Sequence, residues 1–492
     1  MIRQSMKPGA LAIAVALTLV VGVVAVGATA QTAGKIPITT SSDAALQHFL
    51  EARVLFEKIR YPEALAMFER AVTEDPEFAL GHLYVAVLQS STERMIEELD
   101  RAVALSEGVS EGERLFILGV KAAFDGLPQT QGEYYRQMVA AYPDDEHAHY
   151  WLATHYYRQQ AYERALEGYR QAVQLAPGFF EAYNEMGYIY KVLEDYPASE
   201  RAFQKVIELI PDEANPYDSY AELLMKMGRF DSSITVYRKA LALNPDFVTT
   251  YVGIAANLMF LGEHEQARAQ AQKLYDGAHN DGERRWALLV KAIAYVDEGR
   301  PDAALAELEK RYAIAADMSD PSNMADDLVM VGDVLLEAGR LDAAAGKYEQ
   351  AAALIKESDL SPELKEAAER TYIFNAARVD LARGDAATAK VKSDEFRVAA
   401  ETANDPALMR LSRQLDGMIA FHQKDYEAAA EHLASADQNS PHNIYRLARV
   451  HDAMGDHKKA KELCAKAAQA NLISSLDYAF VRAKARAMLA DL

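Results

Sequence analysis

The chain has 492 residues, half of them hydrophobic and a quarter charged, with a formal net charge of −21. This composition is typical of a folded, water-soluble protein and argues against global disorder. The acidic charge argues against nucleic acid as a partner and weakly favours basic peptides. The one cysteine, Cys464, excludes an intrachain disulfide and cysteine-based metal clusters, and we expect it to be a small buried hydrophobe.

Residues 1–30 have the pattern of an export signal. Arg3 and Lys7 precede an almost wholly apolar run over residues 10–28, and Ala28-Thr29-Ala30 is a small-residue cleavage pattern. The apolar run is also long enough to span a bilayer, so an uncleaved inner-membrane anchor is the alternative. We therefore expect an exported protein, either periplasmic or extracellular.

Residues 31–42 show no helical period and predict a linker that ends where a helix starts, near Asp43. Beyond this point prolines recur at intervals of 34 residues, at Pro143, Pro177, Pro211 and Pro245. Each interval contains two stripes of apolar and small residues at helical spacing, which predicts two amphipathic helices, and the proline ends the second helix. Because one such helix pair cannot bury both stripes, the pairs must stack on one another as a solenoid.

The same residue types stand at matching offsets in each interval. The shared sites are an aromatic or histidine, two small residues, and a second aromatic before the proline, as in His149, Ala153, Ala165 and Tyr169, or Tyr183, Gly187, Ser199 and Phe203. This pattern resembles the tetratricopeptide repeat family, most strongly over residues 146–247. The resemblance implies an all-α, right-handed superhelical α-solenoid, for which we expect about eleven to twelve helix pairs.

Changes in the repeat suggest how the solenoid is organised. We expect an N-terminal solenoid over residues 43–281, where the closing proline is then lost, and a more degenerate C-terminal solenoid over residues 282–471. Longer joints at residues 317–327 and 357–362 permit a bend. Residues 472–492 predict a C-terminal capping helix, which a solenoid needs for solubility.

No residue is predicted to be catalytic, and no cofactor or metal is expected. His147 and His149, with His155 nearby, are the densest group of possible metal ligands, but the first two point about 200° apart on a helix. Zinc-binding pairs usually stand at i and i+4, so we expect structural histidines. The sequence also shows no glycine-rich phosphate loop after a strand and no nucleophile elbow.

The family resemblance implies that a stripe on the first helix of each pair lines a concave groove. In the strongest repeats the candidate ligand-binding residues are Tyr150, Thr154, Tyr157, Asn184, Tyr188, Lys191, Asp218, Glu222 and Met225. This aromatic and mixed-polar set is suited to an extended peptide. The alternative is that some of the tyrosines pack against the neighbouring pair. A clamp for a terminal carboxylate is not predicted, because only Asn184 partly matches that branch of the family.

Three functional hypotheses follow. The leading one is an exported, non-enzymatic scaffold that binds a protein or extended peptide segment in its concave groove. The second is a membrane-anchored structural subunit of an envelope secretion, transport or cell-wall assembly complex. The third, least favoured, is an enzyme with a hidden site in residues 282–492. The sequence specifies neither the partner nor the oligomeric state, because repeats of this kind serve unrelated pathways.

Overall fold

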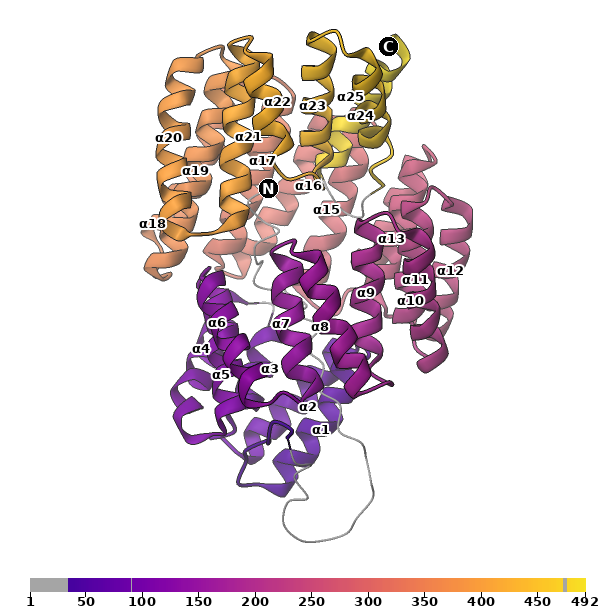
Figure 1. Ribbon diagram of the computed structural model, residues 1–492, viewed down its shortest axis with the longest axis vertical. Helices are drawn as coiled ribbons and strands as arrows, with labels where there is room; N and C mark the ends of the chain where they lie inside the picture. The colour runs from indigo at the N-terminus through magenta and orange to yellow at the C-terminus, as the bar shows by residue number, and fades with distance from the viewer. Residues whose placement is uncertain (1–33, 90, 472–475) are drawn as a thin grey trace. The chain divides into compact units, whose positions relative to one another are not determined.

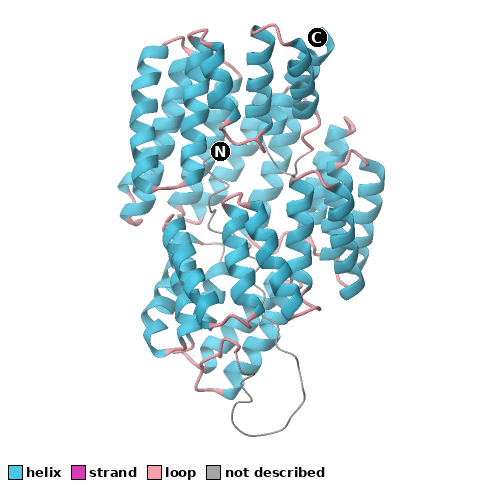
Figure 2. Ribbon diagram, in the orientation of Figure 1, coloured by secondary structure: helices cyan, strands magenta, loops and turns pink. Residues whose placement is uncertain are grey.

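The computed structural model describes residues 34–89, 91–471 and 476–492 (Figure 1). Within these residues the chain forms 25 α-helices and no strand (Figure 2). The helices α1 to α24 make twelve consecutive pairs and α25 follows them, so the predicted all-α solenoid of helix pairs is confirmed. No described helix combines the length and apolar character that crossing a bilayer requires. The predicted export signal, residues 1–30, lies outside the described residues.

The chain divides into two compact units, hereafter the N-terminal unit, which ends at Tyr220, and the C-terminal unit, from Ala221 to Leu492. The helices wholly within the N-terminal unit are α1 (Asp43–Glu57), α2 (Tyr61–Glu74), α3 (Ala79–Leu88), α4 (Thr92–Leu105), α5 (Glu111–Phe124), α6 (Pro128–Ala141), α7 (Glu146–Arg158), α8 (Tyr162–Leu175), α9 (Phe180–Val192) and α10 (Tyr196–Leu209). Helix α11 (Asn215–Lys226) contains the boundary.

The remaining helices belong to the C-terminal unit. They are α12 (Phe230–Leu243), α13 (Val248–Phe260), α14 (His264–Asp276), α15 (Asp281–Asp297), α16 (Pro301–Asp317), α17 (Pro321–Glu337), α18 (Leu341–Glu357), α19 (Pro362–Ala382), α20 (Ala386–Ala403), α21 (Pro406–His422), α22 (Tyr426–Ala434), α23 (Pro441–Ala453), α24 (His457–Ala468) and α25 (Leu476–Asp491). Cys464 is buried in α24, as the sequence predicts.

Small residues on one helix make room for rings on the next. A Cβ atom added at Gly187 in α9 would lie 2.6 Å from Cε1 of Phe203 in α10, closer than real Cβ contacts allow. The hydroxyl of Ser199 donates to the carbonyl of Gly187 at 2.8 Å, so the second small site also joins the two helices. The small residues of the repeat therefore set how closely paired helices approach.

Where a proline ends a helix pair, it also helps to fix the entry to the next helix. In four joints the ring six residues after the proline hydrogen-bonds the proline's carbonyl: His82 to Pro76 (3.0 Å), His149 to Pro143 (2.8 Å), Tyr217 to Pro211 (2.9 Å) and Tyr251 to Pro245 (3.1 Å). The carbonyl at a helix end lacks an intrahelical partner, and the ring supplies one. This bond explains why an aromatic or histidine recurs at this site.

The N-terminal unit curves back on itself. Lys58, at the end of α1, forms an ion pair with Glu213, in the joint after α10, with Nζ and Oε1 2.7 Å apart. Each helix pair rotates slightly relative to its neighbour, and these rotations add along a stack. Within this unit the end of α1 therefore reaches the joint that follows the fifth pair.

The C-terminal unit is tied together by its last helix. Helix α25 packs on α23 and α24, as Figure 1 shows, and also on α15. The hydroxyl of Tyr478 donates to Sδ of Met259 at 3.3 Å, and Nη2 of Arg482 donates to the carbonyl of Phe260 at 3.0 Å. Helix α25 therefore covers the end of the stack and connects it to α13 and α15, near the start of the unit.

Candidate functional site

An extended segment of the chain, residues 35–41, hereafter the strap, is bound by the N-terminal unit. Three of its main-chain N–H groups donate to carboxylates: Ile36 to Asp145 (2.9 Å), Thr39 to Glu113 (2.7 Å) and Ser41 to Asp75 (2.9 Å). At its start, Lys35 forms an ion pair with Glu146. The segment predicted as a linker is therefore held in place over these residues.

Each successive main-chain hydrogen bond of the strap is made about one helix pair further along the solenoid. Its bonded residues are three and two positions apart, and an extended chain rises about 3.3 Å per residue, so they are roughly 7–10 Å apart. Packed helices lie about 8–10 Å apart. The acceptors, which stand before or within the first turns of α3, α5 and α7, thus match the rise of an extended polypeptide.

Two of the three carboxylates also cap a helix start, Glu113 at α5 and Asp145 at α7, whereas Asp75 follows the end of α2. Asp145 is the N-cap of α7 and accepts from the main-chain N–H groups of His147 and Ala148 at 2.9 and 3.0 Å. Burial by itself would raise the pKa of Asp145, but His147 and the main-chain donors outweigh it and lower that pKa to about 2. Asp145 therefore stays ionised while it holds the strap.

Of the predicted groove residues, Tyr150 lies in the core. It is fully buried, and its ring centroid lies 5.2–5.4 Å from those of Trp151, Tyr169 and Phe179. Thr154 is half-buried and bonds the hydroxyl of Tyr169 at 3.0 Å. For Tyr150 the structure therefore agrees with the alternative, packing against neighbouring helices, and corrects its assignment to an open groove.

Three of the other predicted groove residues in the N-terminal unit are more exposed to solvent than Tyr150. Tyr157, Tyr188 and Lys191 are half-buried, and Nζ of Lys191 lies 4.2 Å from the Tyr188 ring centroid, a cation–π contact. The Tyr188 hydroxyl donates to Ser219 at 3.1 Å. Asn184 and Asp218 are largely buried, at 9% and 4% exposure.

The last two predicted residues lie beyond Tyr220, in the C-terminal unit. Glu222 is half-buried. Met225 is 2% exposed and belongs to the apolar core of that unit, and its carbonyl accepts from Asn471 at 3.1 Å. Met225 is thus a core residue, which corrects the prediction that it lines a groove.

A buried charged cluster of the N-terminal unit was not predicted. Arg53 and Glu57 lie on α1, Tyr84 on α3 and Glu181 on α9, with exposures of 7% or less. Ala52 occupies the small-residue site that Gly187 occupies in its own repeat. Arg53, the next residue, therefore stands at the repeat position of Tyr188. The signal was therefore present in the sequence, but only in a repeat outside the strongest block.

These buried charges lie close enough to affect one another's pKa. Burial lowers the pKa of Arg53, and the nearby carboxylates of Glu57 and Glu181 oppose that shift. Burial raises the pKa of Glu181 well above its ordinary value and Glu57 raises it further, while the main-chain N–H of Glu181 itself and Arg53 oppose the rise. Arg53 Nε lies 3.6 Å from Glu57 Oε1, an ion pair without a good hydrogen bond.

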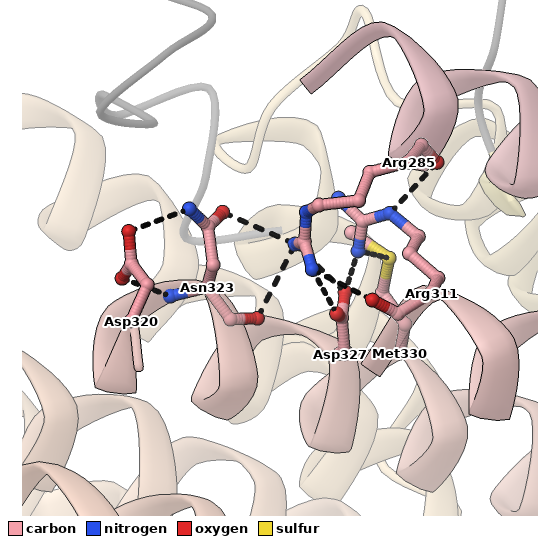
Figure 3. A network of polar contacts seen from close by, with 6 residues as sticks. All are labelled: Arg285, Arg311, Asp320, Asn323, Asp327 and Met330. Atoms are coloured by element: carbon pink, nitrogen blue, oxygen red, sulfur yellow. Dashed lines mark hydrogen bonds and ion pairs between the residues drawn. The ribbon is translucent and has the colours of Figure 1, made fainter. Parts of the chain in front are cut away.

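The C-terminal unit contains a different kind of polar network, in which the charges are matched (Figure 3). Arg285 and Arg311 both reach Asp327, and Arg285 Nη1 lies 2.6 Å from its Oδ2. Arg285 also donates to Asn323, which in turn donates to Asp320 at 3.0 Å. Bonds that satisfy both guanidinium groups indicate a structural network joining α15, α16 and α17.

In a second polar network of the C-terminal unit, acidic and basic side chains also pair with one another. His442 lies between Glu337 and Asp477, at 3.5 Å from each, and Lys484 pairs with Glu337. Despite burial, these partners hold the pKa of Glu337 far below its ordinary value. The network joins α17, α23 and α25, and its acidic side chains have basic partners within the chain.

The histidines near the start of α7 do not converge on one point. His149 bonds the carbonyl of Pro143, whereas Nδ1 of His155 bonds Oε1 of Gln131 at 3.0 Å. His147 is buried, and its ring centroid lies 5.1 Å from that of Phe179. In the described part of the chain, no three His, Cys, Asp or Glu side chains are grouped so as to hold a metal ion.

A chain of helix pairs that stack on one another is typical of the class of helical-repeat proteins. Family models of the tetratricopeptide repeat match residues 133–178, 180–213, 214–247 and 441–472. These four segments of the chain are therefore tetratricopeptide repeats, as the residue pattern indicates. The last match shows that the repeat persists in the C-terminal unit.

Solved structures give distant likenesses. A tetratricopeptide repeat protein from Parabacteroides merdae is 16% identical over 56% of this chain and 94% of its own, with a TM-score of 0.36. The MamA protein is 22% identical over 34% of this chain and 91% of its own, with a TM-score of 0.28. At these low TM-scores neither bears on function. Comparison with curated proteins gave no match.

Proposed function

We propose that this protein is a non-enzymatic scaffold that binds a polypeptide segment on the first helices of its N-terminal unit. Tetratricopeptide repeats generally mediate protein–protein binding. The observation that carries the proposal is the partial exposure of Tyr157, Tyr188 and Lys191 at two stripe positions of the successive first helices α7 and α9. Tyrosine anchors a peptide well because it offers a large contact area and few rotatable bonds.

The strap supports this proposal from within the chain. Its three N–H groups are held by side chains in or directly after three successive joints between helix pairs. The joints of this unit can therefore bind extended polypeptide through main-chain groups, which any sequence provides. Side chains on the first helices would add the selectivity that main-chain bonds lack.

Site-specific photocrosslinking tests the proposal. The crosslinking amino acid p-benzoylphenylalanine replaces Tyr157 or Tyr188 on first helices, and Tyr134 or Tyr196 on the second helices α6 and α10 as matched, half-buried controls. We expect a defined adduct from the first two positions in native cells, and the Tyr157→Ala/Tyr188→Ala variant should lose its partner while keeping its fold. Equal adducts from all four positions would contradict the proposal.

Export is part of the same proposal and rests on the sequence of residues 1–30. The mass of the mature N-terminus and the cell fraction that contains the protein test it together. A chain that begins near residue 31 in the periplasm or medium supports an exported scaffold. An intact N-terminus in the membrane fraction supports the anchored subunit, and a full-length cytoplasmic chain contradicts both.

A further inference from the structure

In the described part of the chain, three buried acceptors on one face of α9 make no hydrogen bond of good geometry. They are both carboxylate oxygens of Glu181 and Oδ1 of Asn184. The two residues are three positions apart, so their side chains lie on the same side of the helix. They are only 5% and 9% exposed. Native proteins rarely leave buried acceptors unmatched, least of all those of a carboxylate.

The charged groups near Glu181 do not satisfy these acceptors. Arg53 affects the pKa of Glu181, yet its Nε and Nη1 atoms have no hydrogen-bond acceptor among the described residues. The Tyr84 hydroxyl is likewise buried without a partner there. Glu57 and Glu181 both lie near the guanidinium of Arg53.

The unmatched groups specify the chemistry of a missing component. Three acceptors require a group with several N–H donors and no acceptor, which describes a guanidinium or an ammonium. A cation would also favour the ionised form of Glu181, whereas an anion would disfavour it. The free donors of Arg53 suit a carbonyl oxygen, which a peptide main chain supplies.

We propose that Glu181 and Asn184 bind the side chain of an arginine or lysine from the polypeptide held by the N-terminal unit. This inference rests on the proposed scaffold function and adds the type of residue that anchors the partner. The site differs from the polar networks of the C-terminal unit, where Asp327 and Glu337 already have cationic partners within the chain. It also fits the chain's net charge of −21, which attracts basic partners.

Calorimetry with two small probes tests the site on the purified chain. N-acetyl-arginine amide carries the guanidinium, and N-acetyl-citrulline amide has the same shape but a neutral urea. We expect the arginine probe to bind about tenfold more tightly than the citrulline probe, and Glu181→Gln to weaken arginine binding by about tenfold. Glu167→Gln, which changes an exposed carboxylate on α8, should have no effect.

Thermal unfolding separates a binding role from a structural one. Glu181→Gln replaces a buried carboxyl group that makes no hydrogen bond of good geometry to another described residue, so the unfolding midpoint without probe should stay the same or rise. A lower midpoint would mean that Glu181 stabilises the fold and would overturn the inference. Equal binding of the two probes, an unaffected Glu181→Gln variant, or no binding of the arginine probe would also overturn it. If photocrosslinking at Tyr188 still captured a partner, the scaffold function would stand without the cation site.

Discussion

The main-chain N–H of Thr39 donates to Oε1 of Glu113 at 2.7 Å, and the Thr39 hydroxyl donates to Oε2 of the same carboxylate at 2.5 Å. Glu113 is 1% exposed and also accepts from the main-chain N–H of Ser110, at the start of α5. One buried carboxylate thus joins the strap to a helix start. Ile36 packs so closely on Gly112 of α5 that a Cβ there would lie 2.8 Å from it. The strap is therefore part of the folded unit.

Removing this carboxylate should destabilise the N-terminal unit. Glu113→Ala leaves three donors without their acceptor, and we expect it to lower the free energy of unfolding by about 2 kcal/mol. Glu111→Ala, an exposed first-turn residue of the same helix, should cost at most about 0.5 kcal/mol. Urea unfolding followed by the fluorescence of Trp151, in a Trp286→Phe background, measures both values. Similar effects of the two substitutions would show that the strap contributes little to stability.

The depressed pKa of Asp145 predicts how stability depends on pH. Its pKa falls from an ordinary value of 3.8 to about 2 in the folded chain, so ionised Asp145 stabilises the fold. This stabilisation is present above pH 3.8 and is lost as pH falls toward 2; it amounts to about 2 kcal/mol. We expect Asp145→Asn to be that much less stable near neutral pH, with the difference shrinking across this window. Asp212→Asn, an exposed control, should show no such convergence.

The fold could be predicted from the sequence because its determinants are local. Helix periodicity, the small residues that receive rings, and the prolines that end pairs all act within one repeat or between neighbours. The ring that bonds the carbonyl of Pro211, Tyr217, is only six residues away. A fixed period of such local features is enough to specify stacked pairs.

The curvature of the N-terminal unit, and the contacts between distant repeats that it creates, could not be predicted from these local features. The small rotations between pairs add up over the N-terminal unit, and only their sum brings Lys58 to Glu213 and Arg53 near Glu181. The strap was missed for a related reason, because its acceptors lie 34 to 109 residues further along the chain. With 73 acidic residues in the sequence, the three that bind the strap are not distinctive.

A glycine that contacts a ring and one that contacts nothing should respond in opposite directions to alanine. A Cβ at Gly253 in α13 would overlap the ring of Tyr237 in α12. Overpacking outweighs the helix propensity gained, so we expect Gly253→Ala to lose about 1–2 kcal/mol of stability. A Cβ added at Gly346 in α18 would have nothing within 4 Å, so Gly346→Ala should gain up to about 1 kcal/mol. Changes of the same sign would contradict the proposed packing role, and Trp286 fluorescence in a Trp151→Phe background reports both.

The matched network around Asp327 should be far more sensitive to charge removal than a surface ion pair in the same unit. Asp327 is fully buried, and Asp327→Asn leaves the guanidinium groups of Arg285 and Arg311 without their counter-charge. We expect a loss of about 3–5 kcal/mol, because an uncompensated buried charge is costly. Asp302 pairs with Arg340 at 2.8 Å in an exposed position, so Asp302→Asn should cost no more than about 1 kcal/mol. Urea unfolding with Trp286 as reporter compares the two, and equal losses would mean that the network does not hold α15, α16 and α17 together.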